Sequence, residues 1–256
     1  MAKVLVTGGA GFIGSHVVDA YIEAGHQVAV IDSLETGSMS RVHPAARFYQ
    51  VDILDSSVEG IIARERPVVV NHHAAQASIS RSIADPVHDA RTNILGSLHL
   101  LDLARKHGVS NFIFASSGGA IYGDQHWYPA DEDHPQNPVN AYGIAKLTVE
   151  RYLAYYDKAH GIRSISLRYA NVYGPRQDPH GEAGVVAIFV GALLDGNRPT
   201  IYGDGRQTRD FVHVLDVARS NVLALNLLLQ GGGASLVDSP VFNISTAKET
   251  SVLEIL

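Results

Sequence analysis

The sequence predicts an α/β protein with a doubly wound parallel sheet and a smaller C-terminal lobe. The first observation is that short apolar runs alternate with segments of helical periodicity, which is typical of a parallel sheet covered on both faces. The second is a glycine-rich turn at residues 7–14, placed between the first apolar run and the first helical segment. Together they predict strands joined by right-handed helical crossovers.

The N-terminal part of the chain supplies most of the predicted sheet. Val4–Val6 is the first strand, and apolar residues then recur at helical spacing until Gly25. The further strands are expected at Val28–Ile31, Phe48–Val51, Val68–Val70, Phe112–Ala115 and Ser164–Tyr169. The helices between them are expected at residues 55–66, 87–107 and 141–160.

Beyond Gly174 the alternation becomes less regular. The expected elements there are a helix at Val185–Leu194, extended pieces at Thr200–Tyr202 and Asp210–His213, a helix at Leu215–Gln230 and a strand at Val241–Ile244. We therefore expect a boundary near residue 174, with a substrate-binding lobe over residues 175–256. Residues 251–256 indicate the first turns of a helix without a C-cap, which suggests an incomplete protein, and residues 231–233 indicate a flexible glycine turn.

Composition and charge narrow the class of protein. Apolar residues make up 46% and charged residues 18% of the chain, which is ordinary for a globular protein, and no apolar run reaches the roughly eighteen residues needed to span a bilayer. The net charge of −6 and the lack of a basic run argue against a nucleic-acid surface. With no cysteine and no signal-peptide pattern, the sequence predicts a cytoplasmic protein without membrane or nucleic-acid partners.

The glycine-rich turn predicts a dinucleotide site. Gly8, Gly11 and Gly14 form G-x-x-G-x-x-G, where glycine allows positive φ, contact of backbone with pyrophosphate, and close helix packing. The N-terminus of the following helix offers free N–H groups to phosphates. Asp32 ends the second strand about twenty residues later, where a carboxylate accepts from a ribose 2′-OH and repels a 2′-phosphate. The prediction is a Rossmann domain over residues 1–174 that binds NAD in preference to NADP.

Tyr142 and Lys146 are four residues apart in a predicted helix, so both side chains lie on the same side of it. A phenol is a weak base at neutral pH because its pKa is near 10, and a neighbouring ammonium group stabilises the phenolate and lowers that pKa. Alone, the pair is better interpreted as a half-buried aromatic residue beside a solvated charge. Beside a dinucleotide site, it predicts a catalytic base and the cation that tunes it.

Three motifs resemble those of the extended short-chain dehydrogenase/reductase family: residues 7–14, Tyr142-x-x-x-Lys146, and residues 167–176. The likeness runs along essentially the whole chain, and within the family the chain looks most like the UDP-glucose 4-epimerases. The resemblance implies an isomerase that interconverts UDP-glucose and UDP-galactose by NAD redox chemistry. The base takes the proton of the sugar C4 hydroxyl, the cofactor takes the C4 hydride, and the 4-keto sugar is reduced again on its other face.

The resemblance also assigns roles to single residues. It implies that Ser117 is the catalytic hydroxyl, Tyr142 the base and Lys146 its partner. It places Asn171 and Arg209 at the nucleotide diphosphate, and a guanidinium suits that place because it can grip phosphate oxygens bidentately. The expected substrate contacts are Ser117, Gly118, Asn171 and Arg209.

The expected cofactor contacts extend beyond the glycine turn. Asp52, with Ile53, ends the third strand and has two readings: it caps the adenine edge, or it is an ordinary residue near a helix N-terminus. The resemblance implies that Gln76 and Asn93 lie near the cofactor or the catalytic helix, and Tyr169 by the nicotinamide. The full set is Gly8, Gly11, Phe12, Ile13, Gly14, Asp32, Asp52, Ile53, Ala74, Ala75, Gln76, Asn93, Ser116, Tyr142, Lys146 and Tyr169.

Gly118 narrows the reaction. Nucleotide-sugar 4,6-dehydratases and UDP-glucuronate decarboxylases of the family carry Glu or Asp directly after the catalytic Ser or Thr, and Gly118 holds that place here. The alternative to a UDP-glucose 4-epimerase is therefore another nucleotide-sugar epimerase or a 4-reductase, acting on an N-acetylated or uronic sugar. An NAD(P)-sensing binding protein is a remote alternative, because the set of Ser117, Tyr142 and Lys146 is intact.

Two further patterns bear on metals and assembly. Neighbouring strand residues point to opposite faces, so His72 and His73 do not predict a metal site, and residues 180–182 are expected to form a loop near the substrate entrance. The helices expected at 87–107 and 141–160 carry more apolar positions than one sheet contact needs. In the family the corresponding helices pair across a two-fold axis, which predicts a homodimer.

Overall fold

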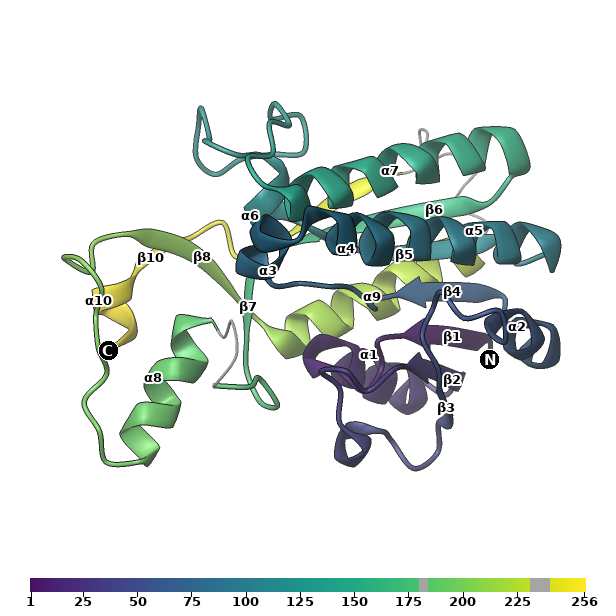
Figure 1. Cartoon of the computed structure of the whole chain (residues 1–256), viewed down its shortest axis with the longest axis horizontal. Helices are drawn as coiled ribbons and strands as arrows, with labels where there is room; N and C mark the ends of the chain where they lie inside the picture. Colours follow the sequence, from purple (N-terminus) through teal and green to yellow (C-terminus); the bar gives the residue numbers. More distant parts are fainter. Residues whose placement is uncertain (180–183, 231–239) are drawn as a thin grey trace.

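The computed structural model describes residues 1–179, 184–230 and 240–256. Its centre is a seven-stranded sheet in the order β3-β2-β1-β4-β5-β6-β9 (Figure 1). Every neighbouring pair in this sheet is parallel, which confirms the predicted doubly wound Rossmann sheet. Because the strand order reverses between β1 and β4, a ligand crevice is expected at the carboxyl ends of these strands.

The strands of the large sheet are short, and their side chains alternate between two faces. The strands are β1 (Lys3–Thr7), β2 (Gln27–Asp32), β3 (Arg47–Gln50), β4 (Val69–His72), β5 (Asn111–Ser117), β6 (Arg163–Tyr169) and β9 (Val241–Ile244). In β1, Val4 and Val6 pack into one apolar cluster and Leu5 packs into another. The protein therefore has two cores, one on each side of the sheet.

Helices cover both faces of the sheet. One face carries α1 (Phe12–Glu23) and α9 (Val214–Leu229), which pack against each other. The other carries α2 (Val58–Glu65), α5 (Gly96–Lys106) and α7 (Ala141–His160), with α5 and α7 along the top of Figure 1. The Asn140 side chain caps α7 by accepting from the Gly143 N–H, which fixes where the helix with Tyr142 begins.

The segment predicted as one helix at 87–107 is divided in the structure. It comprises α4 (Pro86–Ala90), a π-helical turn η2 (Arg91–Leu95) and α5. The π-helical turn carries Asn93, whose side chain forms hydrogen bonds with the backbone N–H and carbonyl oxygen of Gln76. A contact with a residue 17 positions earlier thus holds the irregular geometry. Two short helices were not predicted: α3 (Ile79–Ala84) and α6 (Gly118–Ile121).

A smaller layer lies apart from the large sheet, at the left of Figure 1. It contains a three-stranded sheet in the order β10-β8-β7. Its elements are β7 (Asn171–Tyr173), α8 (Val185–Leu194), β8 (Thr208–His213), β10 (Glu249–Ser251) and α10 (Val252–Ile255). β7 and β8 are parallel, so residues on either side of residue 174 share one sheet.

Two elements from the predicted C-terminal lobe join the large sheet. β9 pairs with β6, and α9 packs on α1, although the sequence placed both within residues 175–256. Apolar periodicity identifies a helix or a strand but not the sheet that it joins. Thr200–Tyr202, expected as an extended piece, belongs to no strand of the described residues. The glycine turn at 231–233 and the loop at 180–182 lie outside the described residues, which include no helix able to span a membrane.

Candidate active site

A cavity of about 470 Å³ opens at the carboxyl ends of the parallel strands, where the strand order reverses. Its walls come from the loops after β1 to β5 and from α7. The predicted residues that line it are Gly8, Gly11, Phe12, Ile13, Gly14, Asp32, Asp52, Ile53, Ala74, Ala75, Gln76, Ser116, Tyr142, Lys146 and Tyr169. One cavity thus brings together every predicted cofactor contact except Asn93.

Gly8 and Gly14 keep the turn after β1 tight. Gly8 has a φ of 70°, and a Cβ there would lie 2.6 Å from the backbone nitrogen of Ala74. A Cβ on Gly14 would lie 2.1 Å from the carbonyl oxygen of Gly8. At Gly11, no side chain of the described residues caps α1, so the first N–H groups of this helix remain available at the cavity.

Asp32 is held at the cavity wall by two backbone groups. Its Oδ2 accepts from the N–H of Ala10 at 2.9 Å, and its Oδ1 accepts from the N–H of Leu34 at 2.8 Å. Each oxygen keeps a further lone pair, so the carboxylate is fixed and still able to accept from a ligand hydroxyl. Asp52 also lines the cavity and accepts from Leu54 in a turn at 2.7 Å, which leaves both readings of Asp52 open.

Tyr142 and Lys146 meet at the inner end of the cavity. Lys146 Nζ donates to the Ala115 carbonyl oxygen at 2.8 Å and lies 5.5 Å from the centroid of the Tyr142 ring. Burial lowers the pKa of Lys146 to about 8, opposed by the carboxylates of Asp89 and Glu150.

The pKa of Tyr142 differs from the prediction. Burial raises it to about 12, and a hydrogen bond with the Ser117 hydroxyl opposes the shift only in part. In the protein by itself the pKa is raised and not lowered as expected, because the cost of desolvating a phenolate dominates. The protein's own residues leave Tyr142 protonated at neutral pH.

Ser117 and Gly118 lie beside Tyr142 but do not line the cavity. Ser117 is the last residue of β5, opposite Tyr169 in β6, and Gly118 begins α6. A Cβ on Gly118 would lie 3.4 Å from the carbonyl oxygen of Arg168, which is an ordinary contact. Space therefore does not require glycine at this position.

Asn171 and Arg209 lie on adjoining strands of the smaller sheet, outside the cavity. Asn171 Nδ2 donates to the carbonyl oxygen of Asp210 at 3.2 Å, and Arg209 Nη1 donates to the carbonyl oxygen of Thr208 at 2.7 Å. Both predicted substrate residues are exposed. The structure thus places them together, on a part of the chain separate from the cofactor residues.

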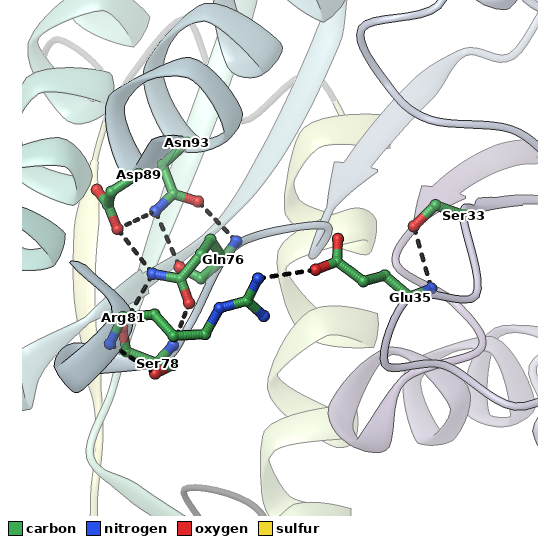
Figure 2. Close-up of polar contacts among 7 residues, drawn as sticks. All are labelled: Ser33, Glu35, Gln76, Ser78, Arg81, Asp89 and Asn93. Atoms are coloured by element: carbon green, nitrogen blue, oxygen red, sulfur yellow. Dashed lines mark hydrogen bonds and ion pairs between the residues drawn. The ribbon is translucent and has the colours of Figure 1, made fainter. Parts of the chain in front are cut away.

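Asn93 supports the cavity wall from behind (Figure 2). Its Oδ1 accepts from the Gln76 N–H and its Nδ2 donates to the Gln76 carbonyl oxygen, both at 2.9 Å. Asp89 Oδ1 accepts from Gln76 Nε2 and from Asn93 Nδ2, both at 3.0 Å. Asn93 was predicted as a cofactor contact but does not line the cavity; this buried residue holds the loop of Gln76, which does.

An ion pair that the sequence did not predict spans the outer part of the cavity (Figure 2). Arg81 Nη2 lies 3.0 Å from Glu35 Oε1, and both side chains line the cavity while 53% and 58% exposed. The pair joins the loop after β2 to α3, whose N-cap Ser78 accepts from the Arg81 N–H. Ser78 was the available signal, because an N-cap residue before an apolar residue indicates a helix start.

The two neighbouring histidines have different partners. The His72 ring bonds the hydroxyls of Thr7 and Ser97, whereas His73 Nε2 lies 3.0 Å from the Tyr169 hydroxyl. Burial lowers the pKa of His73 to about 3, so its ring is neutral. Within the described residues no three His, Asp or Glu side chains are grouped to hold a metal ion.

Comparison with known proteins identifies the family. Residues 4–244 match the model of the NAD dependent epimerase/dehydratase family. The chain belongs to this family. It is 43% identical over 258 residues to a UDP-glucose 4-epimerase of Mycolicibacterium smegmatis, with 99% of this chain and 80% of that protein aligned.

Two solved structures of similar proteins have the same fold as this chain. A UDP-glucose 4-epimerase of Thermotoga maritima with UDP-glucose is 48% identical, with a TM-score of 0.92 over 99% of this chain and 80% of that chain. A UDP-glucose 4-epimerase of Thermus thermophilus in complex with NAD is 44% identical, with a TM-score of 0.90 over 99% and 81%. Both share the Rossmann fold of this family member.

The cavity of this epimerase/dehydratase family member fits NAD. The glycine turn packs so closely that a Cβ on Gly8 or Gly14 would meet backbone atoms, and the free N–H groups of α1 suit a pyrophosphate. Asp32 presents a fixed carboxylate where a ribose hydroxyl is expected. The inner end provides Tyr142 and Lys146 for chemistry at the nicotinamide.

Proposed function

We propose that this protein is an NAD-dependent 4-epimerase that interconverts UDP-glucose and UDP-galactose through a 4-keto sugar. The observation that carries the proposal is the cavity, which has Tyr142 and Lys146 at its buried end and the glycine turn and Asp32 in its walls. Membership of the epimerase family and the likeness to named UDP-glucose 4-epimerases support it.

In the proposed reaction bound NAD would serve as acceptor and donor of the C4 hydride, and its oxidised ring would supply a positive charge that favours the Tyr142 phenolate. Tyr142 takes the proton of the C4 hydroxyl and returns it to the C4 oxygen when the keto sugar is reduced on its other face. Ser117 orients the C4 oxygen by hydrogen bonding. Lys146, fixed by the Ala115 carbonyl oxygen, adds a second positive charge that favours the phenolate.

The buried end has no additional acid for elimination at the position after Ser117. Gly118 carries no titratable group although the site has room for a Cβ, which supports epimerisation over dehydration. Asn171 and Arg209 would hold the nucleotide diphosphate from the smaller sheet while the sugar turns over. Their exposure and shared sheet are consistent with binding a ligand that enters from outside.

The proposal extends to assembly and location. Apolar side chains on α4 and α7 are exposed, among them Val87 at 77%, Ile144 at 51% and Tyr155 at 55%, as expected of a homodimer formed through residues 87–107 and 141–160. A monomeric mass by light scattering would rule that assembly out. A cytoplasmic location without membrane or nucleic-acid partners remains a prediction from the sequence.

A direct assay tests the function. The purified protein is incubated with UDP-galactose, UDP-N-acetylgalactosamine and UDP-glucuronate, the products are resolved, and any nucleotide released on denaturation is identified. We expect UDP-glucose from UDP-galactose and NAD among the released nucleotides. Conversion of only the N-acetylated or uronic substrate would favour the related epimerases, and no conversion with bound NADP would contradict the proposal.

A further inference from the structure

A buried ion pair lies directly beneath the catalytic residues. Arg168 Nη2 lies 2.6 Å from Glu150 Oε2, and Arg168 Nε donates to Glu150 Oε1 at 3.0 Å. The two side chains are only 2% and 6% exposed. A guanidinium and a carboxylate joined by two parallel bonds have their relative orientation fixed, so the pair ties α7 to β6 in one geometry.

The pair is the centre of a longer network. Ser116 Oγ donates to Glu150 Oε1 at 2.6 Å, which adds β5 to the two elements already joined. Arg168 Nη1 donates to the Tyr122 hydroxyl at 2.9 Å, and that hydroxyl donates to Asn243 Oδ1 in β9 at 2.7 Å. Every strand and helix that carries a catalytic side chain is therefore held by this network.

The network lies close in sequence to two catalytic residues, Ser117 and Lys146, and to the cavity residue Tyr169. Ser116 precedes Ser117, and Arg168 precedes Tyr169. Glu150 lies one helical turn after Lys146 on the same face of α7. A shift of Glu150 would therefore move all sides of the site together.

We propose that Glu150 is a positioning residue for the catalytic set: it holds α7 against β5 and β6 through Ser116 and Arg168, and its buried negative charge keeps the Lys146 ammonium group charged. The expected effect of Glu150 on turnover rests on the proposed function. The expected effect of Glu150 on the charge of Lys146 does not depend on that function. Glu150 does not line the cavity, so it acts through its neighbours.

Lys146 lies among several charged and titratable groups. Besides Glu150 these are Tyr142 on α7, Asp89 on α4, His72 on β4 with His73 directly after it, and Arg168 and Tyr169 on β6. Burial of the two histidines lowers their pKa values, and burial of Tyr169 raises its pKa, so these three are neutral at pH 8. The two carboxylates Asp89 and Glu150 thus oppose the effect of burial on the pKa of Lys146.

Titration of Lys146 by NMR tests the electrostatic part. The chain has only five lysines, so labelling lysine Cε with ¹³C gives few signals, and Lys146→Arg identifies the right one. We expect a midpoint near 8 in the unsubstituted protein and a lower midpoint in Glu150→Gln, because losing a buried negative charge favours the neutral amine. An unchanged midpoint in folded Glu150→Gln overturns the proposal.

A double variant guards against misfolding. Glu150→Gln leaves Arg168 as a buried charge without a partner, which destabilises a protein strongly. Glu150→Gln with Arg168→Met removes both charges, and we expect a smaller fall of the Lys146 midpoint because the lost positive charge partly offsets the lost negative one. No fall in this variant also overturns the proposal. Asp102→Asn, which breaks the exposed pair with Arg105 on α5, is the matched control and must leave the midpoint unchanged.

Turnover tests the positioning part. Glu150→Asp keeps the charge but shortens the side chain, so we expect the Lys146 midpoint to stay near its original value while kcat falls at least tenfold and KM changes little. Unaltered kcat in Glu150→Asp contradicts a positioning role. A protein without epimerase activity would refute the proposed function alone, because the NMR titration needs no substrate and still decides the electrostatic part.

Discussion

The two ends of the cavity hold their charges in different ways. Behind the inner end the Glu150–Arg168 pair, which does not line the cavity, is 6% and 2% exposed, whereas at the outer end the Glu35–Arg81 pair is 58% and 53% exposed. The inner pair is doubly bonded and shares its oxygens with Ser116, and the outer pair makes a single contact.

This difference predicts which property each end of the cavity controls, turnover or cofactor binding. A desolvated, fully bonded charge has one low-energy arrangement, so the inner end fixes the geometry of the reacting groups. A solvated pair contributes little to stability and can open at little cost. Substitutions at the inner end should therefore change turnover by large factors, and substitutions toward the outer end should change cofactor binding by progressively smaller ones.

The largest effect is expected at Tyr142. Tyr142→Phe removes the hydroxyl that carries the proton, so we expect kcat to fall about a hundred- to ten-thousandfold, the usual range for a general acid–base group. Bound NAD, measured by release and chromatography, should be unchanged. Tyr152→Phe, on the same helix and 38% exposed, is the control and should keep full activity. Full turnover in Tyr142→Phe would contradict the prediction that the inner end controls turnover.

Local patterns in the sequence were sufficient to predict the parts of the site that depend on short spacing. Gly8, Gly14 and Asp32 follow strand ends at fixed distances, and Tyr142 and Lys146 are one helical turn apart. All five line the one cavity. These predictions needed only the strand order of a doubly wound sheet to bring the residues together.

Other features depend on contacts between distant segments, which spacing does not encode. Glu150 and Arg168 pair because α7 packs on β6, and Glu35 meets Arg81 because the loop after β2 faces α3. The raised pKa of Tyr142 follows from burial, which a sequence pattern cannot measure.

The next effect in size is expected at the glycine turn between the two ends. Gly14→Ala places a Cβ 2.1 Å from the Gly8 carbonyl oxygen, so the backbone must move and NAD affinity should be lost. We expect the free energy of unfolding to fall by about 1–3 kcal/mol, the usual cost of overpacking, in a urea titration. Gly60→Ala, in α2 with no atom within 4 Å of the new Cβ, is the control and should stabilise the protein by about 0.5–1 kcal/mol. Wild-type NAD affinity in Gly14→Ala would show that this turn does not hold the cofactor.

A smaller effect is expected at Asp32. Asp32→Ser keeps an acceptor but loses the charge, and hydrogen bonds to charged groups contribute about 1.5–3 kcal/mol, so NAD affinity should fall about ten- to a hundredfold relative to NADP. Fluorescence titration with both reduced cofactors measures the change. Asp52→Ser is the matched comparison, because Asp52 also lies in a turn at the cavity wall but is exposed. Equal losses in both variants would mean that Asp32 is not the residue that selects the cofactor.

The smallest effect is expected at Glu35, where the outer end is most exposed. Glu35→Gln breaks the contact with Arg81, and because exposed pairs contribute about 0–1 kcal/mol, release of NADH in stopped-flow fluorescence should quicken at most about fivefold. Binding of NADH should quicken as well, so the Kd of NADH changes less than either rate. At about 1 M salt the Debye length is near 3 Å, and the difference should vanish. Exchanging the charges, with Glu35→Arg and Arg81→Glu together, should restore slow release, whereas Asp102→Asn on α5 should leave it unaltered. If the difference in the rate of NADH release persists at high salt, packing and not charge causes it. The outer end would then be held in the same way as the inner end.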